Sequence, residues 1–299
     1  MHLLRPLAGL ALALVTAHAA LATDYTFKVV ATGLAKPTGI AACRTGRLYF
    51  SEIPTPGIGG GFNAVKELRL HNGTTRVIHQ GEPEPVNITV DRHGILYWTC
   101  RSAGVILEQS PYAPATTAMP LLTGLAKPTG IAIDDDGRVY FTQVPTPGVP
   151  GPAGGTNTVS SVSTHNHSRV RLVSQGEPEP TDIAASDDGE LYWTCKSANV
   201  ILTRNERGQI SPLLTGLNKP VGIALDEPRK LLFWTEVPTP GVPGTAGGQN
   251  KIWSYDLKRK VKTLVHSGDP EPTDITVARN GRIYWTCTSA GVIVEARRN

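Results

Sequence analysis

The sequence predicts an all-β fold, a β-propeller of six blades built as three repeats of two blades. Three observations lead to this prediction. Long segments recur at a period of 91 to 92 residues, each repeat divides into two similar modules of 40 to 50 residues, and the 299-residue chain holds 31 glycines and 24 prolines. Modules of this length with four short strands each are typical of propeller blades. A helical bundle or a coiled coil does not fit this composition.

The first element is a predicted secretory signal peptide at residues 1–22. One basic residue precedes an apolar run from Leu7 to Val15, and several alanines follow it. The run is shorter than the roughly 18 residues that a membrane-spanning helix needs. We expect cleavage after Ala19 or Ala22 and an exported, soluble propeller over residues 23–299, located outside the cell or in a periplasm.

Each two-blade repeat carries the same motifs in the same order. The string GLAKPTGI at Gly33 returns at Gly124 and, as GLNKPVGI, at Gly216. A PTPG segment, a GEPEP or GDPEP segment and a YWTC string follow in every repeat. Weaker strings such as YFSE and YFTQ, with the same aromatic-aromatic-hydroxyl order, occur in the other half of each repeat. Together they define six modules.

Within a module, an apolar run, a polar turn with glycine and an aromatic string predict a β-hairpin, as in GIAIDDDGRVYFT at residues 130–142. The last module has chain for only three strands, over Thr273–Val277, Ile283–Thr286 and Gly291–Ala296. Its fourth strand is expected at the start of the mature chain, because Phe27–Leu34 aligns with Ala118–Leu125. The N-terminal strand is thus predicted to close the ring, which removes free sheet edges.

With these motifs the chain resembles six-bladed propellers of the YWTD and NHL types, a superfamily that also contains gluconolactonase-like and strictosidine-synthase-like enzymes. The resemblance covers roughly Tyr25–Arg298. It implies the fold and, for the gluconolactonase type, a divalent ion held by Glu, Asn and Asp at the channel mouth. The fourth position of the YWT-type strings departs from the YWTD pattern, since it is Cys, Glu or Gln and never Asp. We therefore do not expect this chain to form the side-chain hydrogen bonds that the Asp provides in YWTD propellers.

Candidate metal ligands lie at the start of the innermost strand of each module. Glycine alternates there with an oxygen-bearing side chain, and the three polar residues are Asn87, Asp182 and Asp274. Three such oxygens around a pseudo-threefold axis suit Ca²⁺ or another divalent cation, the one cofactor that we expect. The alternative is that these side chains cap the backbone of the inner strands.

The motif-bearing loops are predicted to share one face of the propeller, because the loops after the second and fourth strands of an antiparallel blade lie on the same side. Two sets of three side chains on this face are our candidate ligand-binding residues: Lys36, Lys127, Lys219, Glu84, Glu179 and Glu271. The alternatives are structural pairing of these carboxylates with the lysines and PTPG loops that only form a rim. The opposite face is expected to carry plain solvated turns.

The positions of the cysteines and the net charge of the chain make disulfides and binding to nucleic acid or anionic membranes poor expectations. Cys100, Cys195 and Cys287 are equivalent positions on alternate blades, too far apart for disulfides, and Cys43 lies near the other end of its blade. We expect four reduced thiols. With 29 basic and 25 acidic residues, the chain carries a net charge of +4, too even a balance to favour nucleic acid or an anionic membrane as partner.

The sequence favours a secreted, monomeric recognition module whose partner is a glycan or a protein surface. Repetition of one face suits multivalent binding, and Trp98, Trp193 and Trp285 either form platforms for a ligand or pack between blades. The alternative is an enzyme that acts on a small molecule at the channel mouth with a metal ion as Lewis acid. Whether the chain is an enzyme stays open. Sequons at Asn72, Asn87 and Asn166 are candidate glycan sites.

Overall fold

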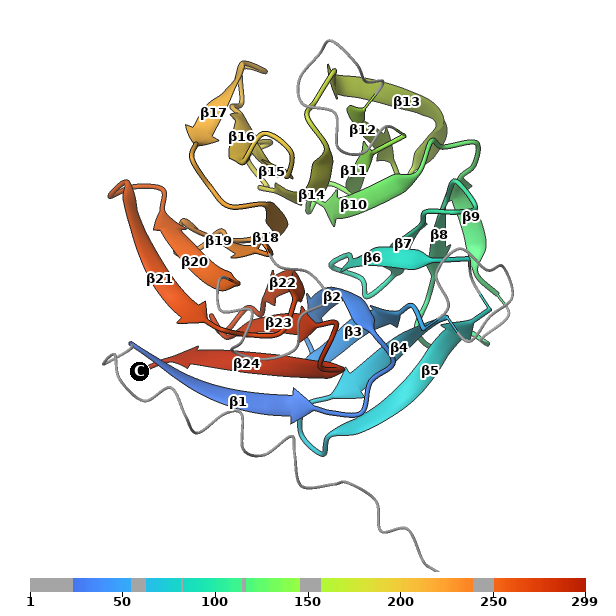
Figure 1. Cartoon of the computed structure of the whole chain (residues 1–299). Coiled ribbons are helices and arrows are strands. Elements are labelled where there is room, and N and C mark those ends of the chain that lie inside the picture. Colours follow the sequence, from blue (N-terminus) through green and yellow to red (C-terminus); the bar gives the residue numbers. More distant parts are fainter. Residues whose placement is uncertain (1–23, 55–62, 82, 115–116, 146–156, 239–249) are drawn as a thin grey trace, which may run out of the picture.

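Six four-stranded antiparallel sheets stand around a central axis as the blades of a propeller (Figure 1). The structure is a computed structural model that describes residues 24–54, 63–81, 83–114, 117–145, 157–238 and 250–299. The described part of the chain contains strands and turns and no helix. The predicted all-β, six-bladed fold is confirmed. The predicted signal peptide and most of the PTPG segments lie outside the described residues.

Each blade contributes one strand to each of four concentric positions. The innermost strands are β2 (Pro37–Cys43), β6 (Pro85–Val90), β10 (Pro128–Ile133), β14 (Pro180–Ala185), β18 (Pro220–Asp226) and β22 (Pro272–Val277). The second strands are β3 (Arg47–Glu52), β7 (Leu96–Cys100), β11 (Arg138–Gln143), β15 (Leu191–Cys195), β19 (Leu231–Glu236) and β23 (Ile283–Cys287). The third strands are β4 (Ala64–Arg69), β8 (Val105–Gln109), β12 (Thr158–Ser163), β16 (Val200–Arg204), β20 (Lys251–Asp256) and β24 (Val292–Arg298). The outermost strands are β5 (Thr74–Gln80), β9 (Met119–Leu122), β13 (Asn166–Gln175), β17 (Ile210–Leu214), β21 (Val261–Ser267) and β1 (Tyr25–Ala31).

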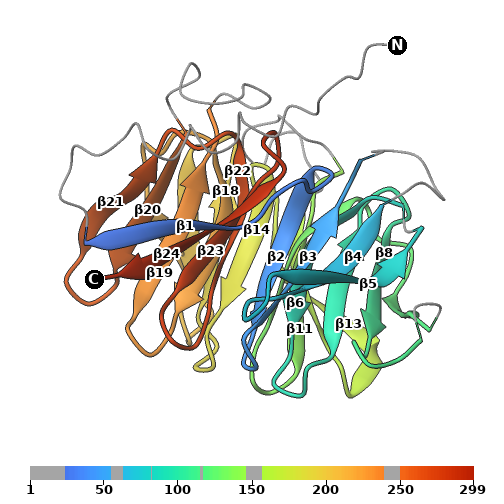
Figure 2. The ribbon, with the colours of Figure 1, turned by 90° about the horizontal axis from the view of Figure 1, so that it is seen from below.

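The ring closes through the two ends of the described chain. Strand β1 pairs antiparallel with β24, from Tyr25 opposite Arg298 to Ala31 opposite Ile293. The sixth blade is therefore β1-β24-β23-β22, with its outer strand taken from the N-terminal side of the chain. In the side view, β1 lies beside β24 at the rim of the disc (Figure 2). This pairing confirms the closure predicted from the incomplete last module.

The blades pack through the aromatic strings of their second strands. Trp98, Trp193 and Trp285 are fully buried, so they pack inside the propeller and are not platforms for a ligand. In one cluster, Trp193 of the fourth blade lies with Ala132 and Tyr140 of the third. Such aromatic packing supplies much of the apolar area that holds neighbouring sheets face to face.

The four cysteines are free thiols, as expected. Cys100, Cys195 and Cys287 are fully buried at the ends of the YWTC strings, and Cys43 is half-buried. Burial raises the pKa of Cys287 well above its ordinary value, with a smaller contribution from the nearby Asp269 charge. These buried thiols act as small apolar side chains, because the thiolate that metal binding and oxidation require is disfavoured.

The hydroxyl of each aromatic string joins two neighbouring strands. In every blade it accepts the backbone N–H at the third residue of the inner strand, where the ladder between inner and second strand shifts register. In four blades the same hydroxyl also donates to a carbonyl of the next inner strand, as Thr194 Oγ1 does to Val221 O at 2.6 Å. A single buried hydroxyl oxygen thus accepts the backbone N–H at the bulge, and the same hydroxyl links adjacent blades.

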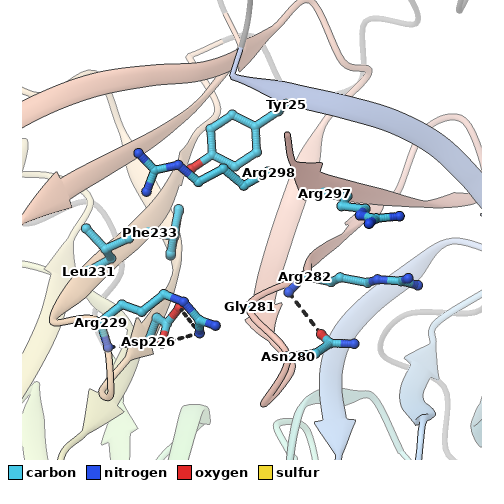
Figure 3. Close-up of a pocket in the computed structure, with 10 residues that line it drawn as sticks. All are labelled: Tyr25, Asp226, Arg229, Leu231, Phe233, Asn280, Gly281, Arg282, Arg297 and Arg298. Carbon is cyan, nitrogen blue, oxygen red and sulfur yellow. Dashed lines mark hydrogen bonds and ion pairs between the residues drawn. The ribbon is translucent and has the colours of Figure 1, made fainter.

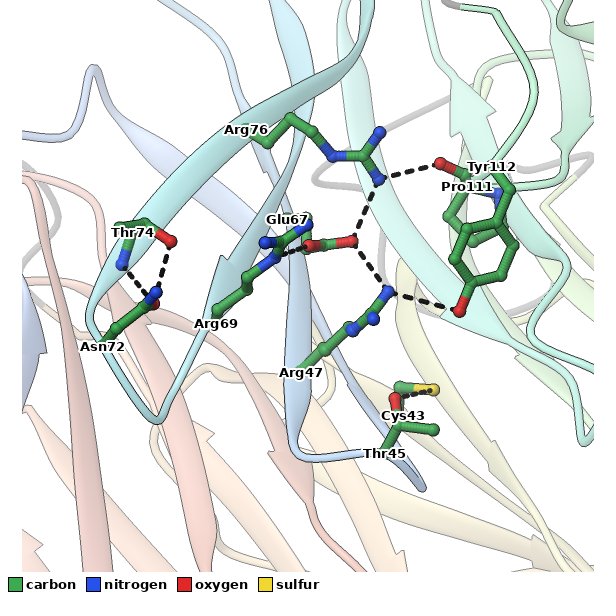
Figure 4. A network of polar contacts seen from close by, with 10 residues as sticks. All are labelled: Cys43, Thr45, Arg47, Glu67, Arg69, Asn72, Thr74, Arg76, Pro111 and Tyr112. Carbon is green, nitrogen blue, oxygen red and sulfur yellow. Dashed lines mark hydrogen bonds and ion pairs between the residues drawn. The ribbon is translucent and has the colours of Figure 1, made fainter.

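The first blade also holds a buried charge network (Figure 4). The Glu67 side chain is fully buried and lies 2.7 Å from Arg69 Nε, 3.1 Å from Arg76 Nη2 and 3.3 Å from Arg47 Nη1. Burial by itself would raise the pKa of Glu67, but hydrogen bonds from Arg69 and Arg76 and the charge of Arg47 hold it below its ordinary value. Arg47 also donates to the Tyr112 hydroxyl, which ties this network to the second blade.

We predict that Thr194→Val destabilises the propeller by roughly 2–4 kcal/mol, because both the Asp182 N–H and the Val221 carbonyl lose a buried partner at about 1–3 kcal/mol each. The matched control is Thr194→Ser, which keeps the hydroxyl and corresponds to Ser51 of the first blade. Urea unfolding of the two variants measures the difference. A valine variant as stable as the serine variant would show that the hydroxyl bridge contributes little.

Candidate functional site

The three polar residues predicted at the channel come together in the structure, near the start of strands β6, β14 and β22. Asn87, Asp182 and Asp274 are each at most 7% exposed. Each side chain accepts the backbone N–H of the next residue on its own strand through Oδ1, at 2.6, 2.8 and 2.7 Å respectively. The backbone-capping alternative is therefore what the structure shows at all three positions.

The two aspartates also cap the neighbouring blade. Asp182 Oδ2 accepts the N–H of Ile223 at 2.8 Å, and Asp274 Oδ2 accepts the N–H of Ile40 at 2.7 Å. Asn87 differs, because its Nδ2 donates to Asp182 Oδ1 at 2.8 Å. The ring is thus threefold in position and asymmetric in its hydrogen bonds.

The alternating glycines follow from a close approach between strands. A Cβ atom on Gly39, Gly130 or Gly222 would lie 2.5–2.7 Å from the Cα of the polar residue on the next inner strand. Real Cβ contacts are longer than this, so an alanine there would push the two strands apart. The inner strands with glycine therefore allow the close approach, and the side chain of Asn or Asp on the next inner strand occupies the space that a Cβ would need.

Two buried carboxyl groups meet at this ring. Burial, and then the charge of Asp274, raise the pKa of Asp182 well above its ordinary value. Burial raises the pKa of Asp274 to about 7, although the N–H groups of Ile40 and Ile275 work in the opposite direction. The pair therefore keeps a proton in mildly acidic solution, because two adjacent buried charges repel each other.

This geometry bears on the predicted metal site. Ca²⁺ takes about 6–8 oxygen ligands, whereas the aspartate oxygens already accept backbone N–H groups and Asn87 turns N–H, not oxygen, toward Asp182. As arranged here, the ring does not fit a calcium ion. No cluster of three or more His, Cys, Asp or Glu side chains suited to a metal occurs among the described residues. A metal role for Asn87, Asp182 and Asp274 stays a prediction.

The six candidate ligand-binding residues form a second ring, one residue before each inner strand. Lysine and glutamate alternate around it in the chain order Lys36, Glu84, Lys127, Glu179, Lys219 and Glu271. All six have positive φ, between 50° and 59°. Their carbonyl oxygens all accept the N–H of the residue that follows the second strand of the same blade. The backbone thus fixes six side chains at equivalent places around the channel mouth.

The lysines and the glutamates of this ring differ in how far they are exposed to solvent. The lysines are exposed, and Lys219 Nζ lies 3.3 Å from the carbonyl of Pro238. The glutamates are half-buried, and each accepts a hydrogen bond from a serine just after the second strand. Glu84 also lies 3.8 Å from Arg101, an ion pair within its own blade. The serine contacts orient the carboxylates, while the ammonium groups of the lysines reach into solvent.

The first acidic residue of the GEPEP segments serves the fold instead. Glu177 is 7% exposed and accepts the indole N–H of Trp193 at 3.2 Å. Asp269 accepts the indole N–H of Trp285 at 2.6 Å and lies 3.1 Å from His266 Nε2. The equivalent Glu82 lies outside the described residues. The sequence analysis missed this role, although the fixed spacing of GEPEP and YWTC in every repeat was a signal for it.

Behind the polar ring, the channel is narrow. A cavity of about 150 Å³ is lined by the inner strands, from the polar ring to residues such as Ala184 and Thr276. On the opposite face, Arg44 of the first blade pairs with Asp135 of the third at 3.1 Å. This ion pair links two of the turns of that face, and both of its side chains are exposed to solvent. The channel suits water or a very small solute.

Comparisons with known proteins support the fold. No family model matches the chain. A protein of Pyricularia oryzae named low-density lipoprotein receptor-related protein 1 is 26% identical over 226 residues, which cover 64% of this chain and 68% of that protein. No helix of the described residues has the length and apolar character needed to cross a membrane.

Among solved structures, a gluconolactonase of Xanthomonas campestris matches with a TM-score of 0.69 at 14% identity, over 92% of this chain and 90% of that one. A streptogramin B lyase matches with a TM-score of 0.62 at 17% identity, over 92% and 98%. A chain of the nidogen/laminin complex matches with a TM-score of 0.61 at 18% identity, over 77% and 80%. At these identities the likeness shows the six-bladed fold alone.

We predict that Asp274→Asn removes a pH dependence of stability. The pKa of Asp274 is higher in the folded protein than its ordinary value of 3.8, so the folded state binds more protons between about pH 4 and 7. The free energy of unfolding of the unsubstituted protein should therefore fall as pH rises through this window. The Asn variant, which mimics Asn87, should show a flatter profile in urea unfolding from pH 4 to 8. Parallel profiles would contradict the raised pKa.

Proposed function

We propose that this chain is a secreted recognition module that binds a protein surface or a glycan through the face around the channel mouth. The observation that carries the proposal is the ring of alternating lysines and glutamates, repeated three times on a fixed backbone. A set of equivalent sites suits a partner that engages several of them at once, because weak contacts then combine.

The charge pattern of the ring favours a polar, mixed partner. Three exposed ammonium groups alternate with three half-buried carboxylates, so the face offers both signs of charge at short intervals. Carboxylates oriented by serine hydroxyls can accept hydrogen bonds from sugar hydroxyls or from backbone and side-chain N–H groups of a protein. Complementary charge on a partner would also speed and orient its approach.

The inner ring supports binding over catalysis. An enzyme needs an acid, a base or a nucleophile that faces the substrate, and the side chains of Asn87, Asp182 and Asp274 are buried and engaged with backbone N–H groups. The narrow channel behind them leaves little room for a substrate. The similarity to a protein named for the low-density lipoprotein receptor-related group and to a chain of the nidogen/laminin complex agrees with a recognition role.

A second candidate function is a metal-dependent, gluconolactonase-like enzyme. The structural likeness to a gluconolactonase over most of both chains favours it, as does the departure of Asn87 from threefold symmetry. Under this alternative, a divalent cation would displace the proton of the aspartate pair, and the polar ring would rearrange. Export, with residues 1–22 as the signal peptide, is part of either proposal and rests on the sequence.

The proposal predicts that the triple variant Lys36→Ala, Lys127→Ala, Lys219→Ala loses partner binding at least a hundredfold, whereas each single variant loses only a few-fold, because the sites combine. The probes are a glycan array and immobilised extracellular matrix proteins, laminin among them. The matched control is Lys28→Ala, Lys258→Ala, Lys260→Ala, which removes the same charge from other exposed positions. Equal losses in the two triple variants would contradict a specific role for the ring.

Thermal unfolding with EDTA and then with added Ca²⁺, Mg²⁺ or Zn²⁺ separates the two functions. A recognition module without a metal site should show the same unfolding midpoint in every condition. An ion-specific rise that Asp182→Asn abolishes, together with hydrolysis of gluconolactone, would overturn the recognition proposal, because a ligand of the native state raises the midpoint by mass action.

A further inference from the structure

A larger cleft lies on the opposite face, between the fifth and sixth blades (Figure 3). Its volume is about 400 Å³, within the range of roughly 300–1,000 Å³ of small-molecule sites. It is bounded by the turn after β18, the turn between β22 and β23, and the paired strands β1 and β24. None of the candidate site residues predicted from the sequence lines this cleft.

Arginines dominate the cleft. Arg229, Arg282, Arg297 and Arg298 line it, and Asp226 is the one carboxylate among its lining residues. Arg229 lies 3.1 Å from Asp226 Oδ2, and Arg282 lies 3.4 Å from Glu295, so these two guanidinium groups are partly neutralised. Arg297 and Arg298 are exposed and have no ion-pair partner among the side chains of the described residues. The lining therefore carries an excess of positive charge.

The Glu67 network shows how this protein neutralises arginines elsewhere. There, Arg47, Arg69 and Arg76 surround one buried carboxylate. In the cleft between the fifth and sixth blades, no carboxylate side chain of the described residues lies within ion-pair distance of Arg297 or Arg298, although Asp24 is close enough to raise the pKa of the neighbouring Tyr25. Like charges that line a concave surface reinforce one another and attract an anion from solution.

The walls of the cleft hold some of these groups in place. The Arg229 guanidinium packs against the backbone of Gly281, where an added Cβ would lie 2.8 Å from Arg229 Cζ. Tyr25 forms part of the wall beside Arg298 (Figure 3), and the charge of Arg298 lowers the pKa of this phenol, which burial raises. An aromatic ring next to a cluster of guanidinium groups offers an apolar surface for the remainder of an anionic molecule.

We propose that this cleft binds a small organic molecule through a phosphate or sulfate group. Guanidinium groups donate paired N–H bonds that match the oxygens of such oxyanions. Arg298, which extends beside Tyr25, and Arg297, which extends from the other side of β24, supply the charge without an ion-pair partner, and Arg229, held by Asp226 and packed against Gly281, lines the same cleft (Figure 3). The site is distinct from the face around the channel mouth, so the two functions are independent.

The test is calorimetric titration of the whole protein at low ionic strength with inorganic phosphate, inorganic sulfate and glucose 6-phosphate, and with glucose as the uncharged control. We expect saturable binding of the anions at one site per chain, none of glucose, and weaker binding in added NaCl. The double variant Arg297→Gln, Arg298→Gln should weaken anion binding at least tenfold. The control Arg169→Gln, Arg171→Gln, on the exposed outer strand β13, should stay within twofold.

The location is tested on the unsubstituted protein, which avoids any folding defect of a variant. Phenylglyoxal modifies accessible arginines, and mass spectrometry identifies the modified peptides. Phosphate should protect Arg297 and Arg298 and leave the modification of Arg169 unchanged. Failure of all three anions to saturate, equal weakening in the two double variants, or absence of protection would each overturn the proposal.

Discussion

The architecture depends on one recurring hydrogen-bonding group, the hydroxyl at the third position of the aromatic strings. A propeller must join sheets that share no ladder hydrogen bonds, and it must also satisfy the backbone where each inner strand bulges. Thr99, Thr194 and Thr286 do both, since each accepts an N–H of its own blade and donates to a carbonyl of the next. Without the hydroxyls of all six strings, the backbone N–H at the bulge of each blade would be buried and unpaired.

The polar ring extends the same principle to the axis. Buried carboxyl groups are destabilising unless hydrogen bonds and shared protons compensate their loss of hydration. Asp182 and Asp274 accept four backbone N–H groups in all, and the charge of Asp274 adds to burial in raising the pKa of Asp182. The ring thus links blades that are distant in sequence, and its chemistry is that of a structural junction. The proposed recognition face is built on this junction, because the alternating lysines and glutamates precede the same inner strands by one residue.

The repeats made the fold predictable, since strand number, blade number and ring closure follow from motif spacing alone. They also located Asn87, Asp182 and Asp274 at the axis. The repeats could not specify hydrogen-bond directions, because the amide of Asn87 has both a donor and an acceptor, and only the folded ring shows that its Nδ2 donates to Asp182. The arginine cleft was beyond sequence reasoning for another reason. Arg229 and Arg297 come from different blades, and only the packed ring brings them to one space.

Closure by β1 and β24 also has a consequence for biosynthesis. The strand made first among those described must wait for the strand made last, so the sixth blade stays incomplete until β24 has been translated. During that interval β1 has no partner strand, and its backbone groups are available to chaperones or to other chains. Completion of the sixth blade is therefore coupled to synthesis of β24, the strand with which β1 pairs.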